Sequence, residues 1–144
     1  MNQEEFSKWI KDVSIAYLAT YDSGKDQPYV RPVDAGTVYN GKIYFSTFSD
    51  TDKVKQINTC HNVELTYFDA GSQLRIAGRV EFVGEQAEQE RFLADNPIIS
   101  NTFSGEKRKQ FTLFQVIPHE VRYMGEDDSV YTAVDWKQTD SVGM

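Results

Sequence analysis

The fold of this chain is decided in one stretch, Lys42-Ile-Tyr-Phe-Ser-Thr-Phe-Ser-Asp-Thr-Asp-Lys-Val-Lys-Gln-Ile-Asn-Thr-Cys-His-Asn-Val-Glu-Leu-Thr-Tyr-Phe68. Ile43 and Phe45 alternate with more polar neighbours, which predicts a half-buried strand at its start. Val54 and Ile57 then recur at helical spacing, and alternating apolar residues close the stretch. The pattern predicts a strand, a turn, one short helix and a second strand.

The turn in the middle of this stretch is crowded with hydroxyl groups. It carries Ser46, Thr47, Ser49 and Thr51 beside two aspartates. Lys53 follows in the first turn of the predicted helix, so free backbone N–H groups, hydroxyls and an ammonium form a candidate seat for a phosphate. Within this window alone, ordinary helix capping and a solvated lysine are the simpler explanation.

The composition favours a single globular domain rich in β-structure. A chain of 144 residues, 40% apolar and 13% aromatic, can build one sizeable core. Its eight Tyr and nine Phe suit the pleated surface of a sheet. The 15 basic and 22 acidic residues give a net charge of −7, and the only basic run is the short Lys107-Arg108-Lys109. Because an acidic protein repels a phosphate backbone, we expect no nucleic-acid partner.

Cysteine usage and hydropathy point to the cytoplasm. Cys60 is the only cysteine, so no intrachain disulfide can form, and a reducing compartment is expected. The chain begins Met-Asn-Gln-Glu-Glu, which is unlike the basic start of a secretory signal. No apolar run approaches the roughly 20 residues that a membrane-spanning helix needs. We therefore expect a cytoplasmic protein with no membrane partner.

Outside the central stretch, the pattern predicts a series of hairpins with a few helices. Pro32 indicates an edge strand or a bulge because proline cannot donate to a ladder. Asn40-Gly41 suits a type I′ hairpin turn. Pro118 is expected to separate the last two strands, and residues 98–110 fit either a loop or a short helix near 106–110. The predicted helices cover residues 2–13 and 84–95, and the predicted strands cover 14–20, 27–33, 37–39, 74–82, 111–117 and 121–124.

These elements predict a mainly β fold of six or seven antiparallel strands. Closing such a sheet removes its exposed edges, so a small antiparallel barrel is expected, with a flat sandwich as the alternative. The predicted domain covers residues 1–125, and residues 126–144 form a polar C-terminal tail. Four apolar or aromatic side chains of the tail could dock on the domain: Val130, Tyr131, Val134 and Trp136.

Four segments in this order resemble the pyridoxamine 5′-phosphate oxidase-like family of FMN-binding split β-barrels, in particular its short general stress proteins. They are Val30-Arg-Pro-Val33, Asn40-Gly-Lys-Ile-Tyr-Phe-Ser-Thr47, Thr51-Asp-Lys-Val-Lys-Gln-Ile57 followed by His61-Asn-Val-Glu-Leu65, and Gln73-Leu-Arg-Ile-Ala-Gly-Arg-Val-Glu81. The resemblance runs from about Phe6 to Met124. It implies a homodimer that holds flavin mononucleotide (FMN) at its interface.

The resemblance also implies which residues hold the cofactor. Arg31 and Lys53 would neutralise the phosphate, Thr47 would hydrogen-bond it with Ser46 beside it, and Gln73 would reach the flavin ring. Such charge-assisted donors are what a phosphate dianion requires. Since neighbouring residues of a strand face opposite sides, Thr47 is expected to be the contact rather than Ser46. The full set of expected cofactor-binding residues is Arg31, Pro32, Val33, Ser46, Thr47, Thr51, Lys53 and Gln73.

The sequence departs from the family members that oxidise the vitamin. Met124 stands where those members carry a tryptophan, and no arginine follows Arg122. The resemblance therefore implies an FMN-dependent oxidoreductase that acts on an unknown small molecule, and not a true pyridoxamine phosphate oxidase.

Three other functions stay open on the sequence. The protein could be a stress-response protein that binds flavin without turning over a substrate, it could be a relative that binds deazaflavin or haem, or its barrel could bind nucleic acid, which the acidic charge disfavours. His61 and His119 have no cysteine or histidine at metal-ligand spacing, so no metal site is expected. Arg75 and Arg79 share one strand face, where ion pairing on the sheet is the favoured interpretation.

Overall fold

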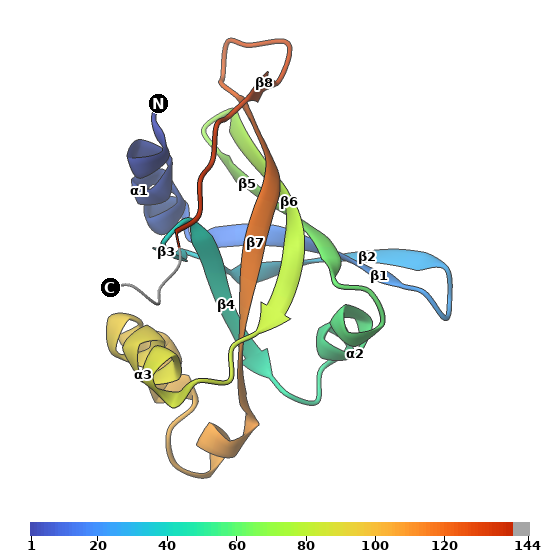
Figure 1. Ribbon diagram of the computed structural model, residues 1–144, viewed down its shortest axis with the longest axis vertical. Coiled ribbons are helices and arrows are strands. Elements are labelled where there is room, and N and C mark those ends of the chain that lie inside the picture. The colour runs from blue at the N-terminus through green and yellow to red at the C-terminus, as the bar shows by residue number, and fades with distance from the viewer. Residues whose placement is uncertain (140–144) are drawn as a thin grey trace.

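The computed structural model describes residues 1–139 and contains one mostly antiparallel sheet with helices around it (Figure 1). The helices are α1 (Gln3–Val13), α2 (Asp52–Thr59), α3 (Gln86–Asp95), α4 (Pro97–Thr102) and the 3₁₀ turn η1 (Gly105–Gln110). The strands are β1 (Ile15–Asp22), β2 (Gln27–Asp34), β3 (Thr37–Tyr39), β4 (Lys42–Phe48), β5 (Asn62–Asp69), β6 (Ser72–Phe82), β7 (Phe111–Met124) and β8 (Thr132–Ala133). The predicted mainly β fold is confirmed.

The sheet is a split barrel and not a closed one. Its strand order is β2-β1-β5-β6-β7-β4-β3, with β8 added to β7. The split barrel that the family resemblance implies is confirmed, whereas the full closure suggested by the strand pattern does not occur within residues 1–139: β2 and β3 form no ladder with each other. Two features explain the open side: β3 has only three residues, and β2 carries Pro28 and Pro32, which cannot donate to a second ladder. The prediction of an edge strand at Pro32 is confirmed.

Local signals at one hairpin turn and at one helix start also hold. Asn40 and Gly41 have φ values of 53° and 78°, as a type I′ turn between β3 and β4 requires. At the start of α1, the side chain of Asn2 accepts from the Glu5 backbone N–H at 2.9 Å. The Glu5 carboxylate in turn accepts from the Asn2 backbone N–H at 3.2 Å, which completes a capping box.

One predicted break was wrong: β7 runs without interruption past Pro118. Gly78 of β6 pairs with Pro118, but Ala77 pairs with Glu120, so the register shifts by one residue at this point. A bulge lets the strand bend while pairing continues on both sides of the proline. The other uncertain segment, residues 98–110, folds as α4 and η1.

Two apolar clusters hold the fold together. The main cluster fills the inner face of the sheet and includes Leu18, Phe45, Leu65 and Ile76, each almost fully buried. α1 closes one side of it with Phe6 and Ile10, and α2 anchors with Ile57. A smaller cluster under α3 and α4 consists of Tyr44, Val83, Phe92, Leu93, Phe103, Phe111 and Leu113. Because Ile57 fixes α2 against the barrel, the polar residues on that helix are held in place too.

The start of the C-terminal tail docks on the barrel. Val134 and Trp136 pack against the main cluster, and the Trp136 indole Nε1 donates to the Gly41 carbonyl at 2.7 Å. Tyr131 also finds a partner on the sheet, whereas Val130 stays exposed. Of the four tail residues expected to dock, three therefore do. Within residues 1–139 no helix has the length and apolar character needed to cross a bilayer.

Candidate functional site

Two cations without a carboxylate partner mark the candidate site, at the junction of β1, β2, β4 and α2. β2 supplies Arg31 and α2 supplies Lys53. Within residues 1–139, neither forms an ion pair with Asp or Glu within 4.0 Å. Figure 1 shows α2 beside the β1–β2 hairpin, which brings the helix to the strand that carries Arg31. We call Arg31, Thr47, Thr51 and Lys53 the anion seat.

Arg31 is fixed by neutral acceptors. Its Nη1 donates to Thr20 Oγ1 at 2.6 Å and to the Leu18 carbonyl at 3.4 Å. Its Nη2 donates to Gln56 Oε1, and Thr20 Oγ1 donates to the same oxygen at 2.6 Å. A guanidinium has five N–H groups, so these contacts leave donors for a ligand.

Lys53 is held in the same way by a hydroxyl. Its Nζ donates to Thr47 Oγ1 at 2.6 Å, and Thr47 Oγ1 lies 3.4 Å from Thr51 Oγ1. Thr51 donates to the Phe48 carbonyl at 3.2 Å and makes no side-chain capping bond to α2, although it is the N-cap residue. Ordinary capping therefore does not account for Thr51. Because Thr51 directs its proton to the Phe48 carbonyl, the Thr47 hydroxyl is the donor in its long contact of 3.4 Å with Thr51, and a phosphate oxygen can replace Thr51 as its acceptor.

The surroundings of both cations disfavour the charged form. Burial lowers the pKa of Arg31, and the charge of Asp52 opposes that effect. Burial also lowers the pKa of Lys53, and the nearby positive charge of Arg31 lowers it further. Removing two cations from water without a counter-ion is unfavourable, so a bound anion would relieve this cost.

Two cavities meet at Lys53. The larger, about 760 Å³, has walls from β2 and α2 that include Arg31, Thr51 and Gln56. The smaller, about 250 Å³, lies between β2, β4 and α4. Seven of the eight sequence-predicted site residues line one or both cavities: Arg31, Pro32, Val33, Ser46, Thr47, Thr51 and Lys53. Ser46 lines the smaller cavity, but of the two neighbours only Thr47 bonds to Lys53.

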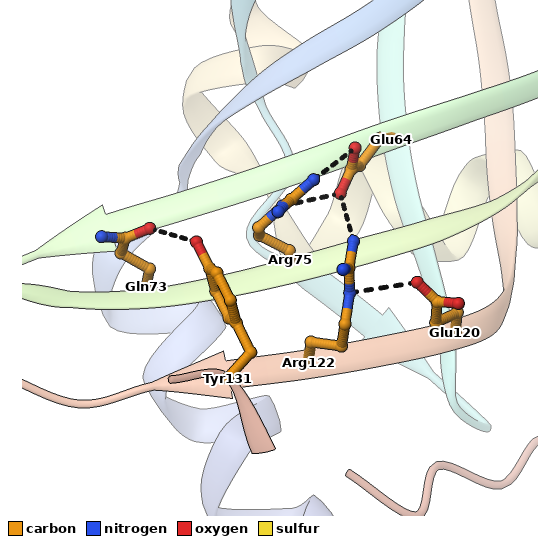
Figure 2. Close-up of polar contacts among 6 residues, drawn as sticks. All are labelled: Glu64, Gln73, Arg75, Glu120, Arg122 and Tyr131. Carbon is orange, nitrogen blue, oxygen red and sulfur yellow. Dashed lines mark hydrogen bonds and ion pairs between the residues drawn. The ribbon is translucent and has the colours of Figure 1, made fainter. Parts of the chain in front are cut away.

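Gln73 is the exception, and it lies elsewhere on the sheet. It starts β6, opposite Phe68 of β5 and Met124 of β7, and lines neither cavity. Its Oε1 accepts a hydrogen bond of 2.6 Å from the Tyr131 hydroxyl, as Figure 2 shows. A single protomer thus does not bring Gln73 to the anion seat.

Next to Gln73, the outer face of the sheet carries a balanced group of charges (Figure 2). Arg75 Nε lies 2.9 Å from Glu64 Oε1, and Arg122 Nη2 lies 3.5 Å from the same oxygen. Arg122 Nε also lies 3.0 Å from Glu120. The expected ion pairing is confirmed for Arg75, whose partner is Glu64 of the neighbouring strand, but Arg79 forms no ion pair within residues 1–139. Because Arg75 and Arg122 each have a carboxylate, this group differs from the anion seat.

Sequence reasoning missed two residues of the site, Thr20 and Gln56. Both are buried, at 2% and 7% exposure, and both bond to Arg31. Gln56 could have been found, because it lies three residues after Lys53 and so shares its helix face. Thr20 carries no such signal, because only the pairing of β1 with β2 brings it near Arg31.

Fold and site together define a split-barrel protein in which β2 and α2 bring together two cations that form no ion pair within residues 1–139. The chain belongs to the pyridoxamine 5′-phosphate oxidase family, whose sequence model matches residues 3–125. No curated relative matches the sequence. Within residues 1–139, no group of three or more His, Cys, Asp or Glu side chains is placed to hold a metal ion.

Solved structures of low sequence identity share the fold. A NimC/NimA family protein from Clostridium acetobutylicum has 22% identity and a TM-score of 0.78, with 92% of this chain and 91% of that chain covered. From the same organism, a protein related to general stress protein 26 of Bacillus subtilis (pyridoxinephosphate oxidase family) has 16% identity and a TM-score of 0.73, with 92% and 94% covered. An FAD-binding protein from Mesorhizobium loti has 16% identity and a TM-score of 0.64, with 84% and 92% covered.

Proposed function

We propose that this protein binds FMN with its phosphate in the anion seat and acts in the cytoplasm as a flavin-dependent oxidoreductase on a small molecule. The observation that carries the proposal is the pair of half-buried cations, Arg31 and Lys53, that form no ion pair within residues 1–139, in a chain of this family. A phosphate monoester supplies the missing negative charge and accepts several charge-assisted hydrogen bonds. The FAD-binding relative supports a flavin in this fold.

Each residue of the anion seat would contact the phosphate in a different way. Arg31 offers a planar fork and Lys53 a point charge, so that one orients the phosphate and the other adds attraction from the side. Thr47 accepts a hydrogen bond from the Lys53 ammonium and would turn its own proton from Thr51 to a phosphate oxygen. Flavin, when bound, supplies hydride and electron transfer, and the protein supplies orientation and electrostatics.

The substrate is not expected to be pyridoxamine phosphate. Recognition of a phosphorylated substrate needs a second set of unpaired cations, and Arg75 and Arg122 on the outer face are already paired with Glu64 and Glu120. No arginine follows Arg122 in the sequence. We therefore propose a small substrate without this phosphate group.

We further propose that two copies form a homodimer through the outer face of β1, β5 and β6. Strand register places Phe68 beside Gln73, and Tyr17 beside Thr66. Phe68 and Tyr17 are 55% and 50% exposed. Large exposed side chains gathered on one face are typical of an interface. Gln73 lies on this face, so a dimer gives it a route to a flavin held by the partner.

Substituting Phe68 by aspartate is expected to convert the dimer to a monomer and to weaken FMN binding, because a desolvated carboxylate in an apolar interface is unfavourable. The measurement is the molar mass in solution by light scattering after size exclusion. Ile98→Asp is the matched control, since Ile98 is 85% exposed on α4. A wild-type monomer, or an unchanged dimer in Phe68→Asp, would remove this face from the interface.

The first test of function is the visible absorption spectrum of the purified protein before and after addition of FMN and desalting. Retained oxidised-flavin bands are the expected result, and they justify a screen of NAD(P)H and small acceptors for turnover. Bound flavin with no turnover of any donor favours a non-enzymatic flavin-binding protein. A Soret band would show that the protein binds haem, and a deazaflavin spectrum that it binds deazaflavin; either result, or a colourless protein, overturns the proposal.

A further inference from the structure

We propose that Gln56 is a positioning residue of the anion seat: it holds the Arg31 guanidinium beside Lys53 without cancelling its charge, which adapts the seat to a phosphate monoester dianion. This inference rests on the proposed function and adds a residue that the family resemblance does not supply. It is carried by the contacts among Gln56, Thr20 and Arg31.

The orientation of the Gln56 amide follows from its partners. Arginine has only donors, so the Gln56 atom that faces Arg31 Nη2 must be the carbonyl oxygen Oε1. The same oxygen accepts from Thr20 Oγ1 at 2.6 Å, while Thr20 Oγ1 itself accepts from Arg31 Nη1 at 2.6 Å. The three side chains therefore close a ring of hydrogen bonds. This ring fixes the plane of the guanidinium before any ligand arrives.

Two of the three members of the ring are buried, which limits their motion. Gln56 and Thr20 are 7% and 2% exposed, and the neighbouring Ile57 is anchored in the main core. Lys53 lies three residues before Gln56, on the same face of α2. One helix thus sets the position of Lys53 directly and that of Arg31 through Gln56. The separation of the two charges therefore depends on how this helix packs against β1 and β2, so the seat is preorganised for a compact anion.

A neutral amide at this position keeps the seat positive. Glutamate would bond to Arg31 in the same geometry, but its carboxylate would form a buried ion pair and neutralise the guanidinium. Asp52 is the carboxylate whose charge raises the pKa of Arg31, and within residues 1–139 Arg31 makes no ion pair within 4.0 Å. With Gln56 in place, both cations remain for one ligand. A phosphate monoester carries close to two negative charges near neutral pH.

The test is Gln56→Glu in the full-length protein, with Gln86→Glu as the matched control. Gln86 is exposed at the start of α3, so its substitution makes the same change in net charge away from the seat. FMN and riboflavin, which lacks the phosphate, are titrated by flavin fluorescence, and the thermal unfolding of the ligand-free proteins is recorded. We expect Gln56→Glu to weaken FMN binding at least about tenfold, because the new carboxylate neutralises one of the two positive charges that attract the phosphate.

The expected pattern is specific to the phosphate. Riboflavin binding should be equally strong, or equally undetectable, in Gln56→Glu and wild type, Gln86→Glu should bind FMN like wild type, and Gln56→Glu should unfold at or above the wild-type temperature. FMN affinity within twofold of wild type in Gln56→Glu, or an equal loss of FMN and riboflavin affinity, would overturn the role of Gln56. Failure of the wild type itself to bind FMN contradicts the proposed function instead, so the two failures are distinct.

Discussion

Replacing Lys53 with alanine is expected to weaken FMN binding by about 1.5–3 kcal/mol, the value of a hydrogen bond to a charged group. This corresponds to roughly 10- to 150-fold in the dissociation constant at 25 °C. The physical reason is that the ammonium spends one N–H on Thr47 and has two left for a phosphate. A fluorescence titration with FMN measures the change.

The same substitution should not destabilise the ligand-free protein. Lys53 is a half-buried cation whose pKa is lowered by burial and by Arg31, so its removal relieves an unfavourable charge. Lys107→Ala serves as the control, since Lys107 is exposed in η1 and lies outside both cavities. Equal FMN affinity in Lys53→Ala and wild type would exclude Lys53 from the seat. A large fall in the unfolding temperature would instead show that Lys53 supports the fold.

Gly78→Ala is expected to lower the free energy of unfolding by about 1–3 kcal/mol, as overpacking of a tight interior does. A Cβ at Gly78 would lie 2.6 Å from the Ile117 carbonyl oxygen and 2.8 Å from Val116 Cγ1. The first of these atoms is backbone next to Pro118, at the bulge of β7, so it cannot move aside without disturbing the pairing of β6 with β7. Urea unfolding followed by circular dichroism measures the effect.

Gly24→Ala is the matched control for Gly78→Ala. Gly24 sits in the turn between β1 and β2, and a Cβ there meets only Asp22 Oδ1 at 3.4 Å, an ordinary contact. We expect Gly24→Ala to leave the free energy of unfolding unchanged or to raise it slightly, because alanine restricts the unfolded chain. If Gly78→Ala were as stable as Gly24→Ala, the bulge would be more adaptable than the close contact implies.

Much of the fold could be predicted because its signals are local. A type I′ turn needs two positive φ angles, which Asn40-Gly41 adopts more easily than most dipeptides, so the dipeptide itself predicts the turn. Asn2 and Glu5 form their capping box three residues apart, and Pro32 marks the edge strand by the donor that it lacks. Such features depend on neighbours in sequence, so a single chain reveals them.

Pro118 shows where local reasoning fails. On its own, a proline in a strand predicts a break, because a ladder donor is missing. The strand continues because Gly78, 40 positions earlier in the sequence, gives room for a bulge on the facing strand. The compensation lies on another element, so no window around Pro118 contains it. The open side of the barrel is a similar case, since it depends on the length of β3 and on which strands meet.

By itself, the sequence determined the mainly β class, the hairpin turns and the two cations that a phosphate requires, because residue types and short spacings carry these properties. Tertiary structure alone decided that Arg31 and Lys53 have no carboxylate partner in residues 1–139 and that Arg31 is held by Thr20 and Gln56. It also placed Gln73 apart from the seat. The physical reason is that charge compensation and hydrogen-bond partnership depend on distances between β1, β2 and α2, and strand pairing and core packing set those distances.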